Sequence, residues 1–455
     1  MILVLIFIAV TLSMLYLKWK YFTTHSPIPS LSPQFLFGNL LQSGVLNGVS
    51  PPHILAAFKK RFGDVFQFWV GPSRFIIVNN IVDVEHIFTH RHIYDQGDIF
   101  IEKFSVSYPN SLISTKETLD GEDISKKNEL LRALRDMISS IMPIIYLPTI
   151  VAKIYVTLSL RQRRARKVIE RYIDKMIQHE LAASSESVVQ RKRTSLIASL
   201  VDALQNNQKL ESIKSEEEKK GKMQNKRIRL KFTDHELSCF FSYLSIGLSR
   251  DEVLDEMVAF LVAGFESTSS TLAWFIHLMS KHPQVQQKIK TELMNDNNLQ
   301  RLSLDRLDSL IYLDCVINEV FRFCPPTTGT IRTLTIDDRL PSSDVQLFKG
   351  ESVLIPFHNL AHDARYWSID PEIFYPERFL GEDKNHHPYA LIPFGGGHRQ
   401  CIGQELARFE LKVIAARLMQ YVTFGDGGIQ VNAGGHSVGL AVIPKHVGVT
   451  IDVTE

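Results

Sequence analysis

The sequence predicts a mainly helical protein with a minor β part, preceded by an apolar N-terminal helix. Segments with helical apolar periodicity recur from residue 54 to residue 419, and the longest runs from Asp251 to Ser280. Strand-like runs are short and fall at residues 65–78, 345–355 and from 431 onward. The first 17 residues carry no charge and are almost wholly apolar. Together these observations favour a single helical body on an N-terminal anchor.

Composition sets limits on the class of protein. Hydrophobic residues make up 45% of the 455 residues and charged residues 22%, which is typical of a globular protein. The formal net charge is only +2, so nothing suggests nucleic acid as a partner. The four cysteines, at positions 239, 315, 324 and 401, form no CxxC pair, which favours a reducing, cytosol-facing environment.

Residues 1–20 predict a signal-anchor helix. The apolar run from Met1 to Leu17 is at the lower limit for a bilayer-spanning helix. Lys18 and Lys20 follow it, so the body should stay on the cytosolic side with Trp19 at the interface. A cleaved signal peptide is the alternative, but no basic region precedes the run and no clear cleavage site follows it. Residues 21–50 contain three spaced prolines and predict a stiff, extended hinge.

The folded body is expected to span residues 51–455. It opens with a helix at 54–61, a hairpin of strands 65–70 and 74–78, and a helix at 82–88. Further helices are predicted at 196–204, 251–280, from Pro283 on, at 313–322 and at 406–419. The charge-dense segment 211–231 predicts an exposed, flexible connector.

Residues 137–160 are strongly apolar and allow two interpretations. One is a second transmembrane helix. Pro143, Pro148 and Lys153 favour the other, in which helices lie over a substrate cavity and dip into the membrane surface. The basic run 161–167 that follows is either a contact with anionic headgroups or a solvated helix face.

One cysteine lies in a glycine-rich segment directly before a predicted helix. This segment, the cysteine loop, comprises residues 394–403 with the sequence FGGGHRQCIG. A cysteine at the positive end of a helix dipole favours the thiolate, which is the form that binds metal. The glycines can let the backbone approach a flat ligand, and Arg399 can pair with a carboxylate of that ligand. On these residues alone, an inert cysteine in a turn is the alternative.

The complete pattern resembles the haem-binding loop of the cytochromes P450, Phe-x-x-Gly-x-Arg-x-Cys-x-Gly. Its fixed positions are filled by Phe394, Gly397, Arg399, Cys401 and Gly403. The resemblance implies that Cys401 is the axial thiolate ligand of the iron of haem b, and that the other four residues help to bind the cofactor.

A polar segment within the long helix carries the second motif, AGFEST at residues 263–268. Gly264 weakens the helix locally, hydroxyls can capture a backbone carbonyl, and a carboxylate beside a hydroxyl can relay protons. A patch of small residues for close helix packing is the alternative. The segment resembles the oxygen-activation motif of the P450 central helix, which implies catalytic roles for Glu266, Ser267 and Thr268 and places Ala263 and Gly264 at the cofactor. Ser267 replaces the usual threonine and lacks the methyl group that restricts its rotamer, so coupling of electron use to product should suffer.

Two further arginine-containing segments resemble family motifs. Glu319 and Arg322 have i, i+3 spacing on a helix, which usually gives only a surface ion pair. They resemble the Glu-x-x-Arg motif of the P450 K helix, whose structural partner would be Arg378. Arg332 matches an arginine that pairs with a haem propionate in many family members, although a strand arginine is as often simply solvated.

The resemblance fails between residues 70 and 273, where the chain has no tryptophan. P450s normally carry Trp-x-x-x-Arg on their C helix, and its polar groups hold a haem propionate. Residues 111–115 resemble the segment before that helix, yet from Met137 the sequence already resembles the later lid region. The C to E helices are therefore expected to be missing or strongly diverged.

The resemblance as a whole implies a P450 monooxygenase in the endoplasmic reticulum membrane, anchored by one helix with its catalytic domain in the cytosol. Electrons from NADPH would arrive through NADPH–cytochrome P450 reductase, with cytochrome b5 as an optional partner, and the substrate would be an apolar small molecule. Two alternatives remain. One is a P450-fold isomerase or dehydratase that acts on a peroxide without a reductase. The other is a catalytically silent membrane protein that retains the fold.

Overall fold

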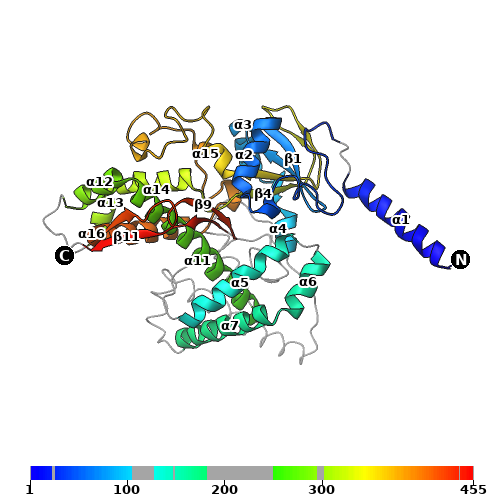
Figure 1. Cartoon of the computed structure of the whole chain (residues 1–455), viewed down its shortest axis with the longest axis horizontal. Helices are drawn as coiled ribbons and strands as arrows, with labels where there is room; N and C mark the ends of the chain where they lie inside the picture. Colours follow the sequence, from blue (N-terminus) through cyan, green and yellow to red (C-terminus); the bar gives the residue numbers. More distant parts are fainter. Residues whose placement is uncertain are drawn as a thin grey trace, which may run out of the picture.

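The computed structural model describes residues 2–22, 26–104, 128–146, 149–181, 249–294, 302–439 and 441–453. The helix predicted at 196–204, the connector 211–231, Cys239 and the segment 111–115 lie outside these residues. Within them, the mainly helical fold with small sheets is confirmed. A sheet-containing part lies next to helix α1 and the first helices, and two groups of helices extend from it (Figure 1).

Helix α1 (Ile2–Tyr21) forms where the anchor helix was predicted and projects away from the body (Figure 1). The side chains of residues 7–19 are exposed. Among the described residues, however, no helix is both long enough and apolar enough to cross a membrane. The same finding covers the described part of residues 137–160, most of which lies in helices α5 (Asn128–Tyr146) and α6 (Thr149–Leu158). The membrane role of α1 therefore stays a prediction.

The largest sheet has five strands in the order β1-β2-β7-β4-β3. The predicted hairpin is confirmed, with Val70 opposite Ser73 at the turn. Strand β2 then pairs in parallel with β7, and β4 is antiparallel to both of its neighbours. The strands and the helices beside them are β1 (Val65–Val70), β2 (Ser73–Val78), β3 (Tyr94–Gln96), β4 (Gly329–Leu334), β7 (Ser352–Pro356), α2 (Pro51–Phe62), α3 (Ile81–Thr89) and α15 (Phe357–Ala361).

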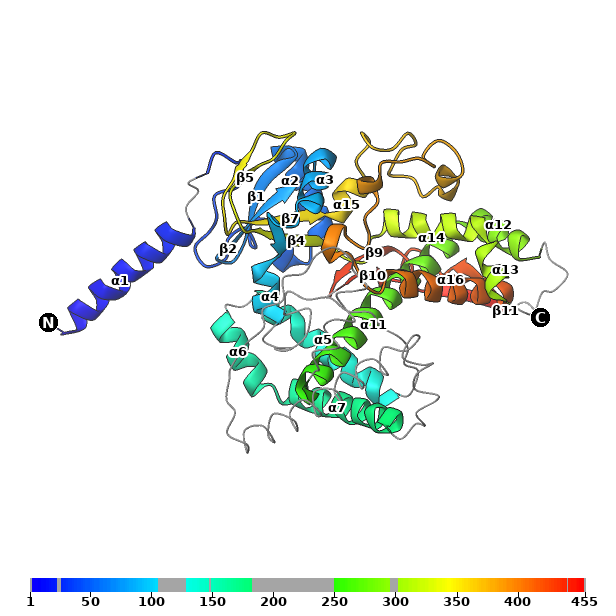
Figure 2. The same ribbon diagram turned by 180° about the vertical axis from the view of Figure 1, so that it is seen from behind.

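Helix α11 (Arg250–Lys281) joins the two helical groups (Figure 2). It begins at a capping box in which the Ser249 side chain accepts from the Glu252 backbone N–H and the Glu252 carboxylate accepts from the Ser249 backbone N–H. Its first half packs in an apolar core with α5 and α7 (Leu160–Leu181). Its second half packs in another core with α12 (Pro283–Met294), α14 (Ile311–Phe323) and α16 (Gln404–Tyr421). The helix continues without interruption through residues 263–268.

The remaining elements are short. Two antiparallel pairs follow α16, β8 with β11 and β9 with β10, which confirms the strands predicted from residue 431 onward. The β9–β10 hairpin crosses α11, because the Ser270 hydroxyl and the Trp274 indole N–H both donate to the Val442 carbonyl, at 2.9 and 2.8 Å. The bounds are α4 (Asp98–Phe104), α13 (Leu304–Asp308), β5 (Asp338–Arg339), β6 (Gln346–Leu347), β8 (Val422–Asp426), β9 (Gly434–Val438), β10 (Val442–His446) and β11 (Val449–Val453).

Candidate functional site

The cysteine loop is a closed turn that ends at the start of α16. The Cys401 N–H donates to the Phe394 carbonyl at 2.8 Å, and the Gln400 N–H donates to the Gly397 carbonyl at 3.0 Å. The Ala407 N–H donates to the Gly403 carbonyl at 2.8 Å and so begins the hydrogen-bond ladder of α16. Cys401 is exposed on this turn, two residues before the N-cap of the helix.

The first residue of the loop, Phe394, is fixed by two helices. Its ring packs edge-on against Phe321 of α14, with 5.0 Å between centroids. The Arg408 guanidinium of α16 lies 5.1 Å from the Phe394 ring centroid and donates to the Asn318 side-chain carbonyl at 2.8 Å. The start of the loop is therefore held by the same core that contains the second half of α11.

The middle of the loop lies against α3. Gly397 has φ +68°, and a Cβ there would lie 2.4 Å from the Phe88 carbonyl oxygen. A Cβ on Gly396 would lie 3.1 Å from the Phe88 ring. Only glycine fits such a contact. The sequence predicted that these glycines allow approach to a flat ligand. At Gly396 and Gly397 the close approach is to helix α3, whereas the space beside Gly403 is open.

Arg332, in strand β4, connects the large sheet to the loop. Its Nη2 donates to the Gly396 carbonyl at 3.2 Å, and its guanidinium lies 5.3 Å from the Phe88 ring centroid. The side chain is buried. Burial and the nearby positive charge of Arg399 lower the pKa of Arg332 to about 10, while Asp95 opposes the shift.

Arg332 and Arg399, the arginine pair, thus lie close enough to repel one another. The Arg399 Nη2 also lies 3.7 Å from Asp95 in β3. A bound group with carboxylates would relieve the repulsion between the two guanidiniums. A sulfur donor on an exposed turn, two adjacent guanidiniums and open space beside Gly403 together fit a metal cofactor that carries carboxylates, as haem does.

The protonation of Cys401 differs from the expectation. The sequence predicted that the helix dipole favours the thiolate. In the structure the protein around the sulfur raises the pKa of the Cys401 thiol, and only the backbone of Gly403 acts in the opposite direction. Although the residue as a whole is exposed, the loop removes enough water from around the sulfur that this cost outweighs the one favourable backbone hydrogen bond. Without a metal the thiol is therefore the favoured form.

The motif on α11 presents an open surface. Ala263 and Gly264 are exposed, and a Cβ on Gly264 would have no atom within 4 Å. The Ser267 hydroxyl donates to the Ala263 carbonyl at 2.8 Å, so the capture of a carbonyl occurs, but within an intact helix. Thr268 is half-buried beside it.

Glu266 faces the turn between β9 and β10. A Cβ on Gly439 would lie 3.1 Å from its Oε1, and the Ala441 backbone forms a hydrogen bond with its carboxylate. Burial raises the pKa of Glu266, and this hydrogen bond opposes the shift. The surroundings therefore make protonation of this carboxyl group easier than it would be in water.

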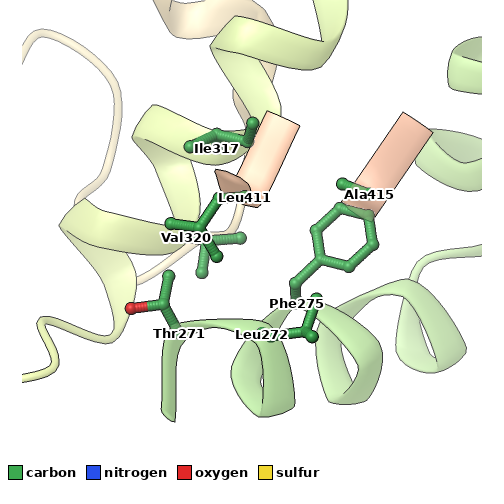
Figure 3. Close-up of a pocket in the computed structure, with 7 residues that line it drawn as sticks. All are labelled: Thr271, Leu272, Phe275, Ile317, Val320, Leu411 and Ala415. Atoms are coloured by element: carbon green, nitrogen blue, oxygen red, sulfur yellow. The ribbon is translucent and has the colours of Figure 1, made fainter. Parts of the chain in front are cut away.

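One turn further along α11, a small apolar pocket lies between α11, α14 and α16 (Figure 3). Phe275 and Leu272 approach it from α11, and Val320 and Ile317 approach it from α14. Thr271 contributes a hydroxyl, which donates to the Ser267 carbonyl at 3.0 Å. The pocket lies within the apolar core that α11 shares with α14 and α16.

Comparison with known proteins identifies the family. A family model described as Cytochrome P450 matches residues 207–426, which include the α11 motif, the Glu-x-x-Arg pair and the cysteine loop. This part of the chain belongs to the cytochrome P450 family. It is 36% identical over 185 residues to a probable cytochrome P450 6a14 of Drosophila melanogaster, and 36% identical over 182 residues to cytochrome P450 3A11 of Mus musculus. These alignments cover 40% and 39% of this chain but only 36% and 35% of the relatives, so the chain matches about a third of their length.

Behind the P450 loop, Glu319 lies between two arginines. Its carboxylate accepts from Arg322 through two bonds of 2.8 Å and from the Arg378 Nε at 3.1 Å. All three side chains are completely buried. Arg378 also donates to the Asp383 carboxylate at 3.1 Å. The cluster joins α14 to the segment that leads into the cysteine loop, which is a structural position and not a place in the reactive pocket.

Sequence reasoning missed Phe88, Asp95 and Arg408. Phe88 and Asp95 lie about 300 residues before the loop, and no spacing pattern connects them to it. Only the pairing of β3 with β4, which places Asp95 opposite Thr333, brings Asp95 to the arginine pair. Arg408 falls on the otherwise apolar loop-facing side of α16, and an isolated arginine there was a detectable but overlooked signal.

Proposed function

We propose that the chain is a haem-thiolate monooxygenase that inserts one oxygen atom from O₂ into an apolar organic substrate. The observation that carries the proposal is the fixed position of the cysteine loop, held by Phe394 on α14 and α16, by Gly397 on α3 and by Arg332 on the sheet. Four elements, three of them distant in sequence, thus support the turn that carries Cys401. Such support is what a metal ligand needs to keep its geometry.

In this proposal each residue has a distinct role. Cys401 holds the iron of haem b, and Arg332 and Arg399 bind its carboxylates. When bound, haem supplies the activation of O₂. Ser267 keeps its hydroxyl proton on the Ala263 carbonyl, so its oxygen can accept a hydrogen bond from water on the open face of α11. The raised pKa of Glu266 makes it easier for this carboxyl group to take up a proton and pass it to such a water. Thr268 adds a second hydroxyl beside it.

The partners and the location are part of the same proposal. Electrons come from NADPH through NADPH–cytochrome P450 reductase, with cytochrome b5 as an optional partner. Residues 1–20 anchor the chain in the endoplasmic reticulum membrane, residues 21–50 form the hinge, and residues 51–455 form the cytosolic catalytic domain. The apolar run before Lys18 and Lys20 supports this orientation. The exposed apolar side chains of α6, Ile150, Val151 and Ile154, support an apolar substrate or surface.

Isotope labelling tests the reaction class. The detergent-solubilised full chain, with haem, would be incubated with reductase, NADPH and ¹⁸O₂ across a panel of fatty acids, sterols and other apolar compounds. The proposal expects one ¹⁸O atom in the product and NADPH consumption that depends on both reductase and substrate. Turnover of an organic hydroperoxide without reductase, with no ¹⁸O from ¹⁸O₂ in the product, would instead support the hypothesis of an isomerase or dehydratase.

A further inference from the structure

Four histidines from three elements meet beside the β9–β10 hairpin. They are His53 of α2, His358 of α15, His362 directly after α15, and His436 of β9, and we call them the histidine cluster. The rings of His53 and His436 are stacked with 4.5 Å between centroids, and those of His358 and His362 are stacked at 4.1 Å. His53 and His358 lie 6.1 Å apart and join the two pairs. His53 is exposed, so water reaches the cluster at this end.

The hydrogen bonds of His53 and His436 suit neutral rings, whereas His362 has an acceptor at each ring nitrogen. The Ser50 hydroxyl lies 2.9 Å from His53 Nδ1 and 3.2 Å from His436 Nδ1, and one hydroxyl can donate to one ring and accept from the other. His362 Nε2 donates to the Phe323 carbonyl at 3.1 Å. Among the described residues, the buried Nδ1 of His358 has no hydrogen-bond partner. A proton there would be left without an acceptor.

The charges around the cluster oppose protonation. Burial lowers the pKa of both His358 and His362, and the positive charge of the buried Arg322 guanidinium acts in the same direction. The Glu372 carboxylate lies 3.3 Å from His362 Nδ1, but it is largely exposed, so water weakens this interaction. The next carboxylate, Asp363, is already paired with Lys59 of α2 and with Arg365.

The other sides of the cluster carry few charges. His277 of α11 is bonded to the Asn432 side chain at 2.8 Å. The hairpin itself contributes Lys445 and His446, which lie near its end and are exposed. Within the part of the chain that the structure describes, the cluster therefore has cations and neutral groups on most sides.

Protonation would thus place like charges on rings that are in contact. Burial, His53 and His362 lower the pKa of His436 to about 4 from its ordinary value of 6.5. The folded form therefore takes up fewer protons than an opened form. The stability contributed by the contact is complete above about pH 6.5 and is lost progressively as the pH falls towards about 4.

His436 also connects the cluster to the site on α11. Its ring packs edge-on against Trp274, with 5.2 Å between centroids. Trp274 and Ser270 donate to the Val442 carbonyl at the start of β10, and Glu266 of the α11 motif faces the turn of the same hairpin. A displacement of β9 from α2 and α15 would therefore move the backbone that lies over the motif.

We propose that the histidine cluster is an acid-sensitive contact that holds the β9–β10 hairpin in place over α11 and releases it when the pH falls. Mildly acidic conditions would then open this side of the site while the helical cores stay folded. The proposal does not depend on the reaction that the site performs, and it can be tested without measuring turnover.

Amide hydrogen exchange on the full chain tests the proposal, with rates corrected for the intrinsic effect of pH. Between about pH 7.5 and about pH 5.5, we expect exchange of residues 434–446 to rise about tenfold relative to that of α14. At about pH 5.5 the imidazole of His436 in an opened hairpin, with its ordinary pKa, would be about ten times more often protonated than neutral. In the closed hairpin the same ring stays mostly neutral. In His436→Gln most of this rise should disappear.

The matched control is His446→Gln, which removes an exposed histidine from the same hairpin. It should show the full rise of the unaltered chain. If His436→Gln fails to fold, His53→Gln at the exposed end of the cluster serves instead and should show a clearly smaller rise. An unaltered chain without any rise, or an equal rise in the unaltered chain and in the cluster variants, would overturn the proposal.

Discussion

Arg332 is the residue that joins the sheet, helix α3 and the cysteine loop. Its guanidinium contacts the Phe88 ring and the Gly396 carbonyl, and it lies near Arg399. We expect Arg332→Gln to lower haem retention about tenfold or more, because a charge-assisted contact to a carboxylate contributes about 1.5–3 kcal/mol. The measurement is the ratio of haem to purified protein. Arg339→Gln, which changes an exposed arginine, is the control and should retain haem normally. Equal haem content in both variants would contradict the assignment.

Two glycines of the site should respond in opposite ways to the same substitution. Gly397→Ala introduces a Cβ 2.4 Å from the Phe88 carbonyl at φ +68°, and should destabilise the fold by about 1–3 kcal/mol. Gly264→Ala lies within helix α11 and meets no atom within 4 Å, so it should stabilise the fold by about 0.5–1 kcal/mol. Denaturant unfolding of both variants measures the difference. A stable Gly397→Ala variant would refute the described contact with α3.

At the scale of elements, the buried Glu319 cluster connects α14 to the segment that leads into the loop. Glu319→Gln keeps the shape but leaves Arg322 and Arg378 buried with one negative charge fewer. We expect a loss of about 3–5 kcal/mol in the free energy of unfolding. The control is Asp344→Asn, at an exposed ion pair with Arg339, where the loss should be about 0.5 kcal/mol or less. Similar losses of unfolding free energy in the two variants would contradict the claim that the buried cluster stabilises the fold more than an exposed ion pair does.

Some features of helix α11 could be predicted from the sequence and others could not. Its extent was predictable because apolar periodicity and a capping box are local signals. Its contacts with Val442 of the hairpin were not, because no local pattern connects Ser270 and Trp274 to a residue about 170 positions away. The direction of Glu266 depends on the same hairpin and could only be learned from the structure.

Across the whole molecule, features set by neighbouring residues could be predicted, whereas contacts between segments distant in sequence could not. The cysteine loop, the helix after it and the hairpin of β1 and β2 follow from neighbouring residues. The parallel pairing of β2 with β7 and the histidine cluster join segments about 270 to 380 residues apart, and scattered histidines carry no spacing signal. The raised pKa of the Cys401 thiol could not be predicted from the helix position alone, because that position says nothing about the loss of water around the sulfur.

The central claim is that Cys401 is a haem ligand, and a reduced carbon monoxide difference spectrum tests it most directly. The measurement would use the detergent-solubilised full chain beside its Cys401→Ala variant, with circular dichroism to establish that both are folded. We expect a Soret band at the position typical of thiolate-ligated haem in the unaltered chain and no such band in the variant. Folded protein without any haem signal, or the same band in both proteins, would contradict the account and favour a silent protein that retains the P450 fold.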